Sequence, residues 1–240
     1  MADPLVDNPR AFAEKVAAVL GGRPVEQGAL SGFASSGFDP FLNHLFASAA
    51  LAPGEAAEAL EGRPGFVWLT EDPVSEAERA QVVLMQGMTA NIADAPVSPV
   101  REGLVAEARS DDDLDDWHEV YSEVFGSDPR SRDEWRRLHA ALGSSADGSL
   151  LLLVARVDGA PAATGAVFFH QDVAGLYCFT TRESMRGRGL ATELVHAAHA
   201  AVRARNVEHA VLQATPSGRP VYARAGYADV RPLPVLAVRR

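Results

Sequence analysis

The alternation of hydrophobic and polar residues along the first 95 positions predicts both helices and a strand. A helical period covers residues 8–20. Asn8 fits the N-cap of this helix, Pro9 its first helical position, and Gly21 the stop after its end. The other elements predicted here are a helix over 52–60, a strand over 65–70 and a helix over 75–86.

The second part of the chain has more pattern. After Ser110, an N-cap residue, Leu114, Trp117 and Tyr121 recur at intervals of three and four residues, which predicts an amphipathic helix. The remaining elements are strands over 103–108, 149–157, 163–170, 173–181, 209–214 and 233–238, and helices over 131–142, over 190–205 and up to Gly226. This order predicts an α/β (α+β) fold, a mixed sheet with helices on both faces.

Residues 94–99 contain two prolines and have the pattern of a linker. They divide the chain into an N-terminal α/β region, residues 1–95, and a larger domain, residues 100–240.

Composition narrows the class of protein. With 240 residues, 47% of them hydrophobic, the chain can bury one large core or two small ones. A net charge of −10 argues against a nucleic-acid partner. The single cysteine, Cys178, excludes an intrachain disulfide and a cysteine zinc site. Without a signal peptide pattern or a run of eighteen apolar residues, we expect a cytoplasmic protein that crosses no membrane.

A glycine-rich turn between the strand 173–181 and the helix 190–205 has the character of an anion site. Helix N-termini offer unpaired N–H groups and partial positive charge. Gly187 and Gly189, just before the helix, let a phosphate approach the backbone without meeting a Cβ. Nearby arginines reverse the acidic charge of the chain locally. They are Arg182, Arg186 and Arg188.

Two nucleotide-binding motifs do not fit this turn. The P-loop needs a Gly-Lys-Ser/Thr ending, which is absent. The dinucleotide fingerprint needs a third glycine where Thr192 stands.

The pattern Gln/Arg-x-x-Gly-x-Gly/Ala does fit, at Arg186, Gly189 and Ala191. Further along, residues 221–227 (VYARAGY) match an aliphatic-Tyr-x-x-x-Gly-aromatic phrase. With the surrounding strands and helices, residues 100–240 resemble the GNAT superfamily of N-acetyltransferases, which implies a mostly antiparallel sheet and acetyl-CoA as acyl donor. The alternative is an arginine-containing solvent turn that caps a core helix.

The resemblance implies a cofactor site along this turn. The strand before it would splay at a bulge and offer main-chain groups to the pantetheine arm. Ser217, at the start of the next helix, would also touch the cofactor, although a helix cap would explain it equally. The implied cofactor contacts are Phe179, Thr180, Thr181, Arg186, Gly187, Arg188, Gly189, Leu190, Ala191, Thr192 and Ser217.

Tyr222 matches the family's catalytic tyrosine, which would protonate the leaving thiolate. The alternative is a tyrosine packed on an amphipathic helix. The general base stays unassigned, because its candidates are placed only by approximate position. These are Glu119, Glu123, His170 and Asp172.

Three further features have structural explanations at this stage. We expect Cys178 to be a buried thiol rather than a nucleophile. His196 and His199 lie off the apolar face of their helix and are expected in solvent, with no metal site. The acidic residues 111–116 favour a helix N-terminus, although they would also attract a cationic amine.

The first half echoes the second weakly. Residues 66–69 and 87–92 resemble 210–213 and 226–230, with Val83 in the place of Tyr222. This resembles the degenerate N-terminal half of tandem GNAT proteins; a generic strand-helix-strand unit is the alternative. Either way, we expect this half to support the fold and wall the acceptor pocket.

Two functions remain open from the sequence. The first is an acetyl-CoA-dependent N-acyltransferase in which an amine attacks the thioester directly. The second is a non-catalytic sensor or regulatory module that binds acyl-CoA.

Overall fold

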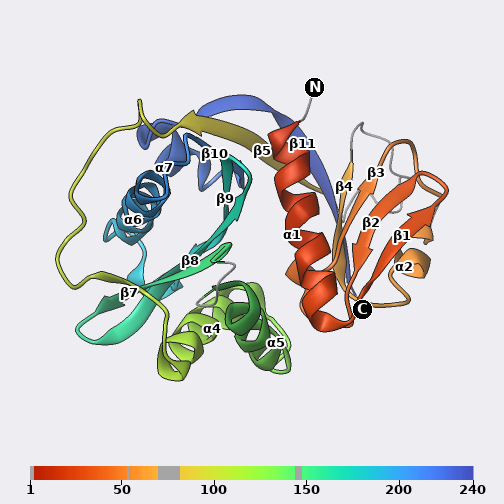
Figure 1. Ribbon diagram of the computed structural model, residues 1–240, viewed down its shortest axis with the longest axis horizontal. Helices are drawn as coiled ribbons and strands as arrows, with labels where there is room; N and C mark the ends of the chain where they lie inside the picture. Colours follow the sequence, from red (N-terminus) through yellow and green to blue (C-terminus); the bar gives the residue numbers. More distant parts are fainter. Residues whose placement is uncertain (1–2, 53, 70–81, 144–147, 240) are drawn as a thin grey trace.

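The computed structural model describes residues 3–52, 54–69, 82–143 and 148–239 (Figure 1). The strands form one sheet in the order β1-β2-β3-β4-β11-β5-β10-β9-β8-β7-β6. They are β1 (Arg23–Gln27), β2 (Leu30–Ala34), β3 (His44–Ala47), β4 (Gly65–Leu69), β5 (Val82–Asn91), β6 (Val105–Glu107), β7 (Leu150–Val157), β8 (Ala160–His170), β9 (Val173–Thr181), β10 (His209–Ala214) and β11 (Ala228–Val238).

Helices cover both faces of this sheet, as the sequence predicts. They are α1 (Pro4–Leu20), α2 (Glu55–Ala59), α4 (Asp111–Phe125), α5 (Ser131–Leu138), α6 (Leu190–Ala204) and α7 (Arg219–Arg224). Helices α1, α4 and α5 share one core with β7, β8 and β9, around Trp117 and Phe168. Helix α6 packs on the opposite face, around Leu194 and Val195. Among the described helices, none combines the length and apolar character needed to cross a membrane.

The sheet is mixed and mostly antiparallel, which confirms the predicted fold class. The parallel pairs are β3 with β4 and β9 with β10. Each pair is joined through a helix, α2 in the first case and α6 in the second. Each also follows two antiparallel pairings, β1-β2-β3 and β7-β8-β9. The same pairing pattern therefore occurs in both halves.

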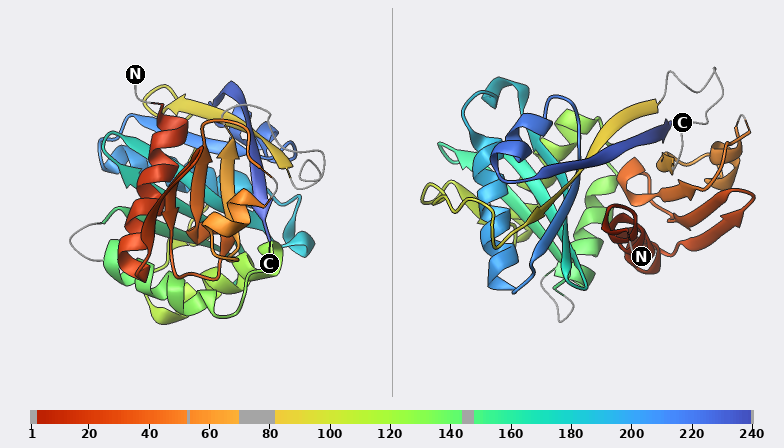
Figure 2. Two further views of the ribbon diagram at one scale, coloured as in Figure 1. Left: turned by 90° about the vertical axis from the view of Figure 1, so that its right-hand side faces the viewer. Right: turned by 90° about the horizontal axis from the view of Figure 1, so that it is seen from above.

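The two halves exchange strands. β5, from the first half, pairs with β10 and β11. β11, from the end of the chain, pairs with β4 of the first half. Figure 2 shows β5 and β11 as long neighbouring arrows that run from one half to the other. The proline-containing segment 94–99 lies between β5 and β6, so strands from both sides of it share one sheet.

Helix α1 begins earlier than the sequence indicates. Asp3 is its N-cap, and Pro9 lies inside the helix. Proline has no N–H to donate to the carbonyl four residues earlier. Here the side chain of Gln213 donates to that carbonyl, on Leu5, at 3.3 Å. Asn8, predicted as the N-cap, is buried instead and binds the Val173 carbonyl at 3.2 Å.

Two other predicted helices differ from the structure. Residues 82–86 of the helix predicted over 75–86 belong to β5, and the rest of that helix lies outside the described residues. The helix predicted over 131–142 ends its α-helical part at Leu138 and continues as a π-helical turn over His139–Gly143. The strands predicted over 173–181 and 209–214 are present with those ends, and the remaining predicted elements are present with shifted ends.

Candidate functional site

The parallel strands β9 and β10 separate at one end. They pair only between Val173–Leu176 and His209–Leu212. Beyond that point β9 continues to Thr181, and its register with β8 shifts next to Thr164. A β-bulge of this kind bends its strand away from the neighbour. The predicted splay of the strand is therefore present, and the edge of β9 that faces β10 is open there.

The bulge places two side chains in special positions. Cys178 has a φ of +55°, in the left-handed region that few non-glycine residues adopt. The ring of Phe179 lies directly over Gly165, where a Cβ would come within 2.8 Å of the ring. A glycine at 165 is what lets Phe179 occupy this place.

The glycine-rich turn connects the open end of β9 to α6. Gly187 and Gly189 have φ values of +76° and +79°, which glycine adopts without strain. The space beside both is open, because a Cβ on either would meet no atom within 4 Å. Gly189 is the N-cap of α6 and caps it with no side chain. The start of α6 is therefore left without a side-chain cap, next to open space at both glycines.

The turn is braced from outside by Arg101. Its guanidinium pairs with Glu193 in the first turn of α6, at 2.7 Å. Its backbone N–H donates to the same carboxylate at 3.0 Å, and its side chain also reaches the Arg188 carbonyl at 3.4 Å. These contacts connect the segment before β6 to the glycine-rich turn and to the first turn of α6.

A pocket of about 740 Å³ lies between the separated strands and the turn. Every residue predicted for the cofactor or for catalysis lines it, except Arg188. Those that line it are Phe179, Thr180, Thr181, Arg186, Gly187, Gly189, Leu190, Ala191, Thr192, Ser217 and Tyr222. Lining residues that sequence reasoning missed are Val124, Phe125, Met185, Thr215, Gly218, Val221 and Arg224.

The charged residues of this lining are basic. They are Arg186 and Arg224, and the described lining includes no aspartate or glutamate, in a chain whose net charge is −10. Arg182, the third arginine near the turn, is already compensated. It pairs with Glu119 at 2.5 Å and with Glu123 at 3.2 Å, both on α4. Its pairing with a helix some sixty residues earlier is invisible in the sequence.

Tyr222 reaches the pocket from α7. Its ring packs edge-on against Phe179 and Tyr227, with centroids 6.5 and 5.9 Å away. Burial among these rings raises the pKa of the Tyr222 phenol above its ordinary value of 10, and the nearby Cys178 thiol adds to the rise. The phenol is therefore protonated at neutral pH and available as a proton donor.

His199 is fully buried, so the expectation that it lies in solvent was wrong. Its Nε2 shares a hydrogen bond of 3.2 Å with the hydroxyl of Tyr227. Burial lowers the pKa of His199 to about 4, with smaller contributions from Arg203 and His196. The apolar stripe of α6 is wider than a helical wheel suggests, because α7 and the start of β11 cover one more side of the helix.

Ser217 does not cap α7. The N-cap is Gly218, whose N–H donates to Thr215 Oγ1 at 3.2 Å. The Ser217 hydroxyl bonds the same Thr215 oxygen at 3.1 Å. Ser217 is thus held at the pocket wall by Thr215.

The four general-base candidates separate into two places. Glu119 and Glu123 pair with Arg182, as described above. His170 and Asp172 lie at the turn between β8 and β9, where they line a second pocket of about 320 Å³ at the opposite end of β9. Cys178 is buried, as expected, and burial raises the pKa of its thiol. Within the described ranges, no group of three or more potential ligands is arranged for a metal ion.

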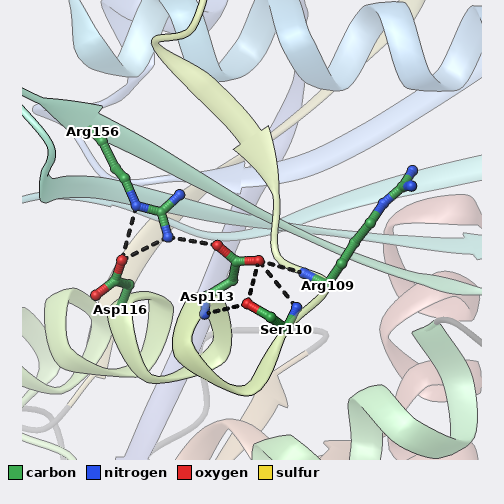
Figure 3. Close-up of polar contacts among 5 residues, drawn as sticks. All are labelled: Arg109, Ser110, Asp113, Asp116 and Arg156. Carbon is green, nitrogen blue, oxygen red and sulfur yellow. Dashed lines mark hydrogen bonds and ion pairs between the residues drawn. The ribbon is translucent and has the colours of Figure 1, made fainter.

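Two of the acidic residues of α4, Asp113 and Asp116, have structural partners (Figure 3). Ser110 and Asp113 form a capping box, in which the Ser110 Oγ accepts from the Asp113 N–H and the Asp113 carboxylate accepts from the Ser110 N–H. Arg156 on β7 pairs with Asp113 and Asp116, at 2.7 and 2.6 Å. This supports the helix-terminus explanation over attraction of a cationic amine.

The chain was compared with family models and with solved structures. A model of the family described as "Acetyltransferase (GNAT) family" matches residues 112–227. The fold resembles that of a putative acetyltransferase from the GNAT family of Novosphingobium aromaticivorans, with a TM-score of 0.64, 21% identity and 99% of each chain covered. It also resembles a GCN5-related N-acetyltransferase from Kribbella flavida, with a TM-score of 0.60, 19% identity, and 96% of this chain and 95% of that chain covered.

A conserved protein of unknown function from Staphylococcus epidermidis has the same fold, with a TM-score of 0.61, 13% identity, and 92% of this chain and 95% of that chain covered. No curated protein matches the chain. The three structures cover both halves, so the two-part architecture with its single sheet is shared beyond this protein.

Proposed function

Because a model of the GNAT acetyltransferase family matches residues 112–227, we propose that the protein transfers an acetyl group from acetyl-CoA to an amine. The observation that carries the proposal is the pocket between β9, β10 and the start of α6. Its open helix N-terminus, two open glycines and two arginines suit the pyrophosphate of an anionic cofactor.

Each part of the cofactor has a counterpart in the pocket. The pyrophosphate would bind at the N–H groups that follow Gly189, where the partial positive charge of the helix is greatest. The pantetheine arm would follow the open edge of β9 at Phe179, Thr180 and Thr181, whose main-chain groups have no partner from β10. The thioester would then lie near Tyr222, deeper in the splay.

In the reaction, the amine nitrogen attacks the thioester carbonyl, and the carbon–sulfur bond breaks as the amide bond forms. Tyr222 would give its proton to the departing sulfur. Because the pKa of the phenol is raised, Tyr222 holds this proton until the thiolate develops. The amine releases its surplus proton to water, and the Tyr222 phenolate takes a proton back from water, so that the enzyme is regenerated. No side chain is assigned as general base.

Gly189→Glu tests the cofactor assignment. It places a carboxylate and a Cβ where the pyrophosphate would lie, and we expect acetyl-CoA binding to be lost in calorimetric titration. Gly159→Glu is the matched control. Gly159 also has a positive φ, +82°, and open space for a Cβ, but it lies in the β7–β8 turn. If both variants bind acetyl-CoA as the wild type does, the proposed site is wrong.

A further inference from the structure

A loop from the first half of the chain inserts a buried carboxylate between α4 and α5. Asp39 is fully buried. It accepts hydrogen bonds from the Tyr121 hydroxyl of α4 at 2.8 Å and from the Trp135 indole N–H of α5 at 3.4 Å. Within its own turn it accepts from the Phe41 N–H at 2.9 Å. Burial raises the pKa of Asp39, and these donors oppose the rise.

A second carboxylate makes the contact reciprocal. Glu134 of α5 accepts the Phe38 N–H with both oxygens, each at 3.1 Å. The Arg130 guanidinium lies 3.7 Å over the Phe38 ring. The loop and the helix pair thus each place a carboxylate on the other. A buried polar contact of this kind fixes one geometry, because a shifted arrangement leaves a buried charge without donors.

The contact extends to the pocket wall through aromatic rings. Tyr121 lies one helical turn before Phe125, and their ring centroids are 5.0 Å apart. Phe41, two residues after Asp39, packs on the same Phe125 ring at 6.1 Å. Phe125 and Val124 are the part of α4 that lines the 740 Å³ pocket. Because Phe125 is 46% exposed, its position depends on the rings beneath it.

We propose that Asp39 is a positioning residue for acyl transfer, a role that rests on the proposed function of the pocket. Through Tyr121 it holds the last turn of α4, and that turn sets where Phe125 stands at the pocket wall. The first half of the chain contributes no residue to the described lining of this pocket, and at this contact it would act on the reaction by positioning the wall of the pocket.

Asp39 could instead have a purely structural role. The Tyr121→Phe variant distinguishes a structural role from a positioning role. It keeps the ring and removes one donor to Asp39. Trp68→Phe is the control, because it removes one donor, the indole N–H, from another buried ring. The Trp68 indole donates to His44 Nδ1 at 3.1 Å, within the first half of the chain. A structural role predicts equal effects of both variants on the site.

The experiment compares wild type, Tyr121→Phe, Asp39→Asn and Trp68→Phe. We expect all three variants to lose stability in urea. Only the two at the Asp39 contact should speed amide hydrogen exchange over residues 121–128. They should also lower kcat/KM for the amine by roughly ten- to a hundredfold, the range for small misplacements of a site, while the Kd for acetyl-CoA changes little. Combining Asp39→Asn with Tyr121→Phe should add little to either single change.

Each outcome decides a separate point. If exchange over 121–128 and kcat/KM in Tyr121→Phe match those of Trp68→Phe, Asp39 has no positioning role, even though the enzyme is active. If wild-type protein binds no acetyl-CoA, the proposed function fails, and the role of Asp39 in acyl transfer fails with it.

Discussion

The Tyr222 ring packs against two other aromatic rings beside the open end of β9. Phe179 and Tyr227 fix its ring edge-on from two sides, so few rotamers are open to it. Its raised pKa favours a group that donates a proton over one that removes a proton. These features suit an acid that acts late, when charge develops on the sulfur.

We therefore expect Tyr222→Phe to lower turnover strongly and to leave acetyl-CoA affinity nearly unchanged. The change removes one hydroxyl and keeps the ring packing. Positioned acid catalysis contributes about a hundred- to ten-thousandfold, which bounds the expected loss in kcat. Steady-state kinetics with an identified amine and calorimetry on the same preparation measure the two quantities.

Tyr227→Phe is the control for this change. It also removes one hydroxyl, but that hydroxyl binds His199 and lies outside the pocket lining. It should cost stability and leave kcat close to the wild-type value. Wild-type turnover in Tyr222→Phe, with chemistry rate-limiting, would make Tyr222 a packing residue and leave the departing sulfur without an assigned proton donor.

Residues differ in how far the sequence predicts their place. The glycines of the turn are predictable because a positive φ before a helix leaves few other choices. The burial of His199 is not predictable, because it depends on how much of α6 is covered by α7 and β11. Asp39 gave no signal either, since its donors Tyr121 and Trp135 lie more than eighty residues away.

At the scale of elements, the Asp113 side chain at the start of α4 both caps its own helix and binds the neighbouring strand β7. The Asp113 carboxylate accepts the Ser110 N–H at 3.0 Å, the Ser110 hydroxyl at 2.8 Å and the Arg109 N–H at 3.1 Å. Its other oxygen pairs with Arg156 of β7. Hydrogen bonds from Ser110, opposed by partial burial, hold the pKa of Asp113 well below its usual range. The helix cap is thus also the attachment of α4 to the sheet.

Asp113→Ala is expected to lower the free energy of unfolding by about 1–2 kcal/mol, the usual size of a lost cap. Asp112→Ala, one position earlier and exposed, tests whether charge near the helix start is sufficient. Its loss should stay within about 0.5 kcal/mol. Urea unfolding followed by circular dichroism measures both. Equal losses would mean that the helix dipole, rather than the capping box and Arg156, accounts for the stability.

Element boundaries were predictable where a local sequence signal marks the beginning or the end of a helix or strand. Ser110, Gly21 and the turn at 158–159 are examples. Pro9 misled the prediction of α1, because a proline usually marks a first helical turn. Its place inside α1 depends on Gln213, which donates to the Leu5 carbonyl from a strand two hundred residues later.

At the scale of the whole molecule, the exchange of β5 and β11 ties the halves together. Residues 1–95 contain β5 but neither β10 nor β11, the strands that pair with it. They also leave β4 without β11. The division of the chain near residue 95, which follows from its prolines, therefore cuts through shared strand pairings. The topology was not predictable from local pattern, since Trp68 pairs with Val235.

A fragment of residues 1–95 should neither fold cooperatively nor bind acetyl-CoA. It would expose two long strand edges, and it lacks the glycine-rich turn. Thermal unfolding by circular dichroism and calorimetric titration test the two statements. Co-expression of 1–95 with 96–240 should restore binding, because the missing strands are then supplied in trans. Cooperative unfolding of 1–95 alone would contradict this account.

The pairing of β4 with β11 also constrains how the chain is made. The ribosome synthesises Phe66 and Trp68 early, but their partner strand begins only at Ala228. At 5–20 residues per second, translation from Trp68 to Val235 takes on the order of ten to thirty seconds. During that interval β4 has an unpaired apolar edge, the kind of surface that chaperones hold. We expect the nascent protein to depend on them more than its modest size suggests.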